Sequence, residues 1–167
     1  MNARLTVVTG LLGSLIVVLS QFVTAYSLED QFGVNMANVT LLDKHGPLTL
    51  ALAALAGLAL LFLIVAAANA PAESRPVALA VGIVVGGMGL AVILIFLLVD
   101  LPDIGDTGMY DAPGSGNLDA TGTASAGLWL ELVGGVILLL AGAALATIEA
   151  SWLDGAAPDR EESPRTD

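Results

Sequence analysis

The chain has 167 residues, of which 56% are hydrophobic and 13% are charged, whereas an ordinary soluble domain carries about 25% charged residues. This composition excludes a soluble globular protein and predicts an integral membrane protein whose first partner is the lipid bilayer. The net charge of −11 argues against nucleic-acid binding, and the absence of cysteine excludes disulfides, thiolate metal sites and cysteine nucleophiles.

Four apolar segments predict four transmembrane helices. They cover residues 5–26, 47–70, 76–99 and 124–152. At a rise of about 1.5 Å per residue, each is longer than the roughly 30 Å of a bilayer core. Pro47 and Pro76 stand at the first positions of the second and third segments, where proline suits a helix start. The sequence therefore predicts an all-α membrane protein, with residues 1–152 forming a four-helix up-and-down bundle.

The first segment has a second interpretation as a signal peptide. The apolar run follows "MNAR" and ends in "VTA", a pattern compatible with cleavage after Ala25. However, the run exceeds the roughly 7 to 15 residues of a signal peptide, and bulky Phe22 precedes the cleavage position. We expect a retained helix, and a mature N-terminus at Tyr26 is the alternative.

The basic residues predict the orientation of the chain in the plasma membrane. Arg4, Arg75, Arg160 and Arg165 fall on one side of the predicted bundle, and Lys44 falls on the other. Because basic residues near the ends of spans stay inside, we expect both termini to be cytoplasmic. Residues 27–46 and 100–123 then form outer loops, and the polar residues 153–167 form a disordered cytoplasmic tail.

Glycines at helical spacing predict close packing of the third and fourth segments. The candidates are Gly82, Gly86, Gly134, Gly135 and Gly142. Small residues on one face let two helix backbones approach closely inside a membrane. We expect these faces to pack within one chain, and self-association through the glycine faces is the alternative.

Glu131 is the candidate polar site, because it is a carboxylate within the fourth apolar segment. At about 100° per residue it shares a face with the glycines of that segment, whereas Trp129 points elsewhere. Trp129 and Trp152 are expected to be interfacial anchors roughly 34 Å apart, which places Glu131 near the outer surface. We predict a shallow, inward-facing carboxylate, and its candidate partners at the same level are Gln21, Tyr26, Lys44 and His45. We expect a contact with Gln21, with Lys44 as the alternative ion-pair donor.

Other residues give no signal for catalysis or metal binding. The second outer loop carries Asp100, Asp103, Asp106, Asp111 and Asp119. Their spacing lacks the ligand pattern of an EF-hand, so we expect a solvated acidic loop rather than a calcium site. His45 is the single histidine, and no nucleophile elbow or phosphate-binding loop occurs. The sequence predicts no catalytic residue, metal or cofactor.

The four spans, and the course from "DLPD" after the third span to "GLWLELVGG" in the fourth, resemble small uncharacterised four-helix membrane proteins of actinobacteria. That resemblance implies the topology and no known activity. We therefore expect a non-enzymatic structural or accessory subunit whose outer loops face another membrane protein. The alternative is a small transporter or channel component that uses Glu131 as a proton or cation site. Almost no polar residue lies in the middle of segments two and three, which disfavours a conduit through one chain.

Overall fold

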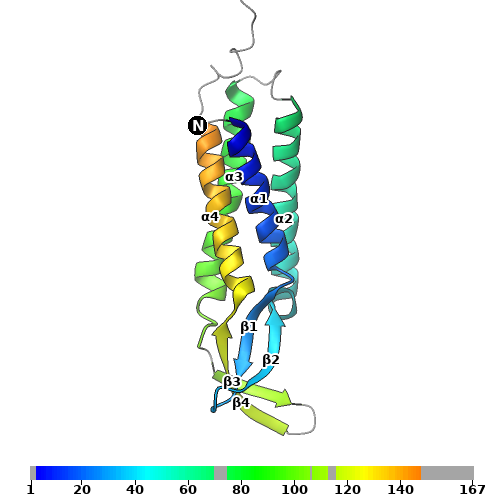
Figure 1. Cartoon of the computed structure of the whole chain (residues 1–167), viewed down its shortest axis with the longest axis vertical. Coiled ribbons are helices and arrows are strands. Elements are labelled where there is room, and N and C mark those ends of the chain that lie inside the picture. Colours follow the sequence, from blue (N-terminus) through cyan, green and yellow to red (C-terminus); the bar gives the residue numbers. More distant parts are fainter. Residues whose placement is uncertain (1–2, 70–74, 106, 113–115, 148–167) are drawn as a thin grey trace, which may run out of the picture.

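The computed structural model describes residues 3–69, 75–105, 107–112 and 116–147. Four helices form a bundle that a β-sheet extends at one end, and α1 begins and α4 ends at the opposite end (Figure 1). The helices are α1 (Ala3–Ser20), α2 (Leu41–Asn69), α3 (Arg75–Ile95) and α4 (Ala126–Thr147), and the π-helix η1 (Phe96–Asp100) continues α3. The strands are β1 (Thr24–Glu29), β2 (Asn35–Thr40), β3 (Thr107–Ala112) and β4 (Gly116–Ala124).

Among the described residues, three helical segments are long and apolar enough to cross a membrane. They are Leu41–Val65, Leu79–Asp100 and Ala126–Thr147. The apolar part of α1, Leu5–Ser20, is shorter. The first predicted segment is too long, because the helix ends at Ser20 and the chain is extended from Thr24. A mostly helical protein suited to a membrane is thus confirmed, with three helices of spanning length instead of four.

The prediction of a purely α-helical protein is wrong, because both predicted outer loops contain strands. These strands form an antiparallel sheet in the order β2-β1-β4-β3, in which Tyr26 of β1 is paired with Val39 and with Ala124. β1 follows α1 and β4 precedes α4, so the packing of these two helices brings the central strands together. Gly33, with a φ of 75°, supplies the left-handed residue in the turn between β1 and β2.

α2 starts at Leu41, earlier than the predicted start at residue 47, and it contains a break. A reciprocal cap holds its first turn: the Thr40 hydroxyl donates to the Asp43 carboxylate at 2.7 Å and accepts from the Asp43 N–H at 3.1 Å. The backbone is non-helical at His45 and Gly46, and Pro47 begins the straight part of the helix. The predicted boundary therefore coincides with the break in α2.

Two clusters of buried apolar side chains stabilise the molecule. The bundle core comprises Val17, Leu52, Ala56, Ala59, Leu63, Val85, Val92, Leu138 and Leu145. The junction core, where the bundle meets the sheet, comprises Ala25, Tyr26, Leu41, Phe96 and Leu128. Because the junction core draws on α2, α4, β1 and η1, it fixes the position of the sheet on the bundle.

The predicted packing glycines lie at contacts between helices of the same chain. A Cβ built at Gly142 would collide with the backbone of Gly86 and lie 2.7 Å from the Gly82 carbonyl oxygen. On the side of α4 that faces α1, a Cβ at Gly134 would lie 2.6 Å from Cγ2 of Val17. A Cβ at Gly135 would lie 2.9 Å from Cγ1 of Val92 in α3. These glycines let α4 pack closely against both α1 and α3.

Candidate functional site

Polar side chains gather where the bundle meets the sheet. This junction cluster consists of Gln21, Tyr26, Lys44, His45, Asp100, Asp103 and Glu131, which come from the end of α1, from β1, from the start of α2, from η1 and the turn after it, and from α4. Gln21, Lys44 and Glu131 were predicted as site residues, and Tyr26 and His45 were predicted at the same level, whereas Asp100 and Asp103 were not predicted in this cluster. Asp100 and Asp103 belong to the stretch "DLPD", and His45 belongs to the "HG" before Pro47.

The π-helix η1 places Asp100 in the cluster. The Leu101 N–H donates to the Phe96 carbonyl at 2.7 Å, one residue further than an α-helical bond, and both Phe96 and Asp100 are only 2% exposed. Short π-helical turns occur often at functional sites. Here the wider turn ends α3 with an aromatic ring and a carboxylate, both buried at the junction.

Tyr26 connects the sheet to this turn. Its hydroxyl donates to the Asp100 carbonyl oxygen at 2.9 Å, and the Lys44 Nζ lies 4.6 Å from the centre of its ring. Burial, and secondly the nearby carboxylates of Asp100, Asp103 and Glu131, raise the pKa of the Tyr26 hydroxyl. The phenol therefore keeps its proton and remains a hydrogen-bond donor.

Two basic side chains of α2 pair with the aspartates after α3. Lys44 Nζ lies 2.7 Å from Asp103 Oδ2, and His45 Nε2 lies 3.1 Å from the same oxygen and 3.5 Å from Asp100 Oδ1. The prediction that Lys44 is the alternative ion-pair donor for Glu131 is therefore wrong. When it pairs with Asp103, the Lys44 side chain remains 34% exposed to water. A pair with Glu131 would bury the Lys44 ammonium, and removing that charge from water costs free energy.

Glu131 is fully buried, and neither of its carboxylate oxygens has a hydrogen-bond partner in the described part of the chain. Its level follows from its neighbours in α4: Gly127 packs on the backbone of Val23 and Thr24, and Gly134 packs on Val17. Glu131 lies between these contacts, opposite the end of α1. Its carboxylate interacts electrostatically with Asp100 and Tyr26.

The contact predicted between Gln21 and Glu131 is not made by a hydrogen bond. Gln21 is fully buried, and its Nε2 donates to the Val17 carbonyl at 3.2 Å and to the Ser20 hydroxyl at 3.0 Å. The last carbonyls of a helix lack intrahelical donors, and the Gln21 amide directly after α1 supplies one. Its Oε1 has no partner among the described residues.

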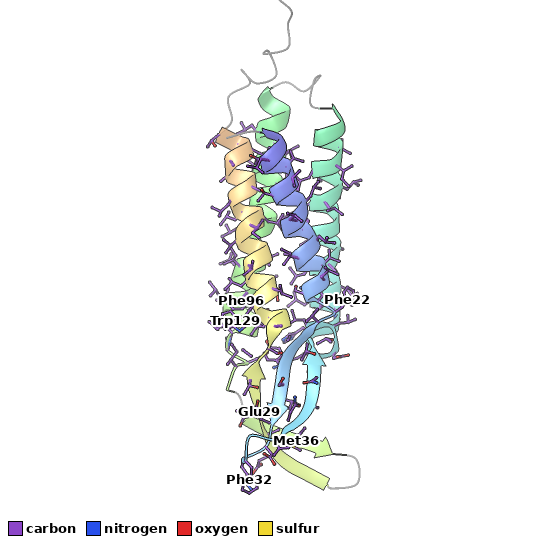
Figure 2. The ribbon with its side chains drawn as sticks, viewed as in Figure 1. Phe22, Glu29, Phe32, Met36, Phe96 and Trp129 are labelled. Atoms are coloured by element: carbon purple, nitrogen blue, oxygen red, sulfur yellow. The ribbon has the colours of Figure 1, made fainter. Side chains whose placement is uncertain are left out.

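Three aromatic side chains, of which Phe22 and Trp129 are exposed and Phe96 is buried, lie at the junction of bundle and sheet (Figure 2). Figure 2 shows Phe22, Phe96 and Trp129 at similar heights, where the helices meet the sheet. Trp129 is 50% exposed and its ring centre is 6.1 Å from that of Phe96, while Phe22 is 57% exposed. Exposed aromatic rings at one level are typical of a membrane interface. The second predicted anchor, Trp152, and the predicted tail, residues 153–167, lie outside the described residues.

No group of three or more His, Asp or Glu side chains suited to a metal ion occurs in the part of the chain that the structure describes. Within the acidic loop, Asp100 and Asp103 face the basic residues of α2. The side chains of Asp106 and Asp111 are not among those described. The junction cluster can therefore bind or release protons and form ion pairs, and two of its carboxyl groups, Asp100 and Glu131, are buried.

No family model matches the chain. Neither the curated proteins nor the solved structures give a significant match to it.

Proposed function

We propose that the protein is a non-enzymatic accessory subunit of the plasma membrane whose sheet binds a partner protein outside the bilayer. The observation that carries this proposal is the exposed apolar tip of the β1–β2 hairpin. Phe32 is 80% exposed and Val34 is 59% exposed. Figure 2 shows Phe32 at the end of the sheet farthest from the bundle.

The position of this tip distinguishes it from the exposed leucines of the helices. Apolar side chains along the bundle face lipid, but lipid does not reach a side chain at the far end of the sheet. An exposed aromatic ring surrounded by polar surface is typical of a protein contact. Next to the tip, β2 pairs with β1 on one side only in the described sheet, so its other edge is open to a further strand.

The interior of the bundle also favours an accessory role over transport. The bundle core consists of apolar side chains, with the small hydroxyls of Thr6 and Ser14 also buried in the bundle, and α4 packs closely against α1 and α3 at glycines. A transport path in one chain needs polar groups through the middle of the membrane. A transporter or channel component that uses Glu131 remains the alternative. It requires an assembly of several chains.

The orientation is part of the proposal. Arg4 lies in the first turn of α1 and Arg75 begins α3, both at the end away from the sheet, and Lys44 lies at the sheet end. This distribution supports cytoplasmic termini and an outer sheet. Self-association through the glycine faces is not part of the proposal, because Gly86 and Gly142 already pack against each other within the chain.

A photo-crosslinking amino acid at position 32, introduced in native membranes, tests the proposal. We expect it to capture one partner protein. Without crosslinking, at least about tenfold less of that protein should co-purify with the Phe32→Ser variant than with the wild type, because the variant loses a central aromatic contact. The matched control is position 140, because Leu140 is also well exposed, at 62%, but lies on the bundle. Equal capture of the same protein at both positions, or unchanged recovery by Phe32→Ser, would contradict the proposal.

A further inference from the structure

The interior of the junction has an excess of hydrogen-bond acceptors. Both oxygens of Glu131, Oδ2 of Asp100 and Oε1 of Gln21 are buried, and none has a donor among the described residues. Buried polar atoms are nearly always hydrogen-bonded, so four unpartnered acceptors at one junction need an explanation. A single proton on one carboxylate converts an acceptor into a donor.

The charges around Glu131 show which group lacks a counter-ion. At its level the end of α1 and the residue after it offer only the neutral Ser20 and Gln21, β1 offers the protonated Tyr26, and η1 offers the carboxylate of Asp100. The two basic groups, Lys44 and His45, are engaged with Asp103 and Asp100. At most two positive charges therefore face three carboxylates, and Glu131 is the one without a pair.

An ionised carboxylate with neither a counter-ion nor a hydrogen bond is unstable in a buried site, and such a group binds a proton instead. A metal ion is disfavoured, since the described residues hold no group of three ligands. We propose that Glu131 is a proton-binding site: its carboxyl is neutral in the closed junction, and release of the proton to water accompanies separation of the sheet from the bundle.

The sign of the pH effect follows from this assignment. The closed junction holds the Glu131 proton, and the open junction releases it, so closing takes up a proton. Raising the pH therefore favours the open state, by about tenfold per pH unit while one proton is released per opening. Release also places a second negative charge next to Asp100 and the Tyr26 hydroxyl, which joins β1 to η1. This inference is independent of the proposed partner.

Infrared spectroscopy of the purified protein in lipid tests the site directly. We expect a protonated-carboxyl band at neutral pH that shifts in heavy water, is absent in Glu131→Gln and Glu131→Ala, and persists in Glu29→Gln. Glu29 is a suitable control because its carboxylate, on β1, accepts a hydrogen bond from Thr123. A band that both Glu131 variants retain, or no band at neutral pH, would overturn the proposal.

Hydrogen exchange measures the coupling to the sheet. After correction for intrinsic exchange, protection of the β1 and β4 amides in the wild type should fall at least about tenfold as the pH rises over the range in which the band disappears. The same protection should change less than about twofold in Glu131→Gln. Equal pH dependence in both proteins would contradict the coupling. Stabilisation by sodium chloride but not by choline chloride, without a carboxyl band, would instead assign the site to a metal cation.

Discussion

Replacing Gly142 with alanine is expected to lower the free energy of unfolding by about 2 to 3 kcal/mol, the upper range for overpacking in a tight core. The added Cβ would meet backbone atoms of Gly86 and the Gly82 carbonyl oxygen, and backbone cannot rotate away as a side chain can. α3 and α4 must then move apart where Gly142 faces Gly82 and Gly86, and the packing between the two helices weakens. Titration of the purified protein with a denaturing detergent, followed by circular dichroism, measures the loss.

Gly87→Ala is the matched control for this prediction. Gly87 lies next to Gly86 in α3, but a Cβ there would have no atom within 4 Å. Because alanine is the better helix former, this change should be neutral or stabilise the protein by up to about 1 kcal/mol. If both alanine variants unfold at the same detergent concentration, close approach at Gly142 does not stabilise the bundle.

The helices, and the side of α4 that faces the interior of the bundle, could be predicted from the sequence. Long apolar segments and glycine spacing are local patterns, and they identify the buried side of α4 on which Glu131 lies. The strands could not be predicted in this way. β1 pairs with β4 from the other end of the chain, as in the pair Leu28 and Gly122. Such pairing depends on how the helices pack and leaves little trace in a short polar stretch.

The ion pairs of Lys44 and His45 with Asp100 and Asp103 were missed for a different reason. The prediction placed Gln21 and Lys44 at the level of Glu131 by counting the rise per residue along ideal helices, and therefore assumed that the helix backbone is regular. The break at His45 and Gly46 and the π-turn before Leu101 turn the ends of α2 and α3 toward each other. Ion pairs between these ends occupy the basic groups. Backbone irregularities of this kind are not visible in apolar periodicity.

Tyr26→Ala is expected to cost about 3 to 5 kcal/mol at the junction, as other large aromatic truncations in a core do. Tyr26 is 2% exposed, packs in the junction core and bonds the Asp100 carbonyl. Its loss leaves a cavity between β1 and η1, while the bundle core is unchanged. Hydrogen exchange should therefore accelerate strongly in β1 and β4 and little in the middle of the helices.

Two further variants show whether the effect comes from the ring of Tyr26, from its hydroxyl, or from the loss of any aromatic ring near the junction. Tyr26→Phe keeps the ring and loses one hydrogen bond, so it should cost about 1 kcal/mol. Phe22→Ala removes an aromatic ring two residues before β1 that is 57% exposed, and it should leave exchange in the sheet unchanged. If Tyr26→Phe accelerates exchange as much as Tyr26→Ala, the hydrogen bond to Asp100 holds the sheet. If neither variant does, the junction core does not fix the sheet on the bundle.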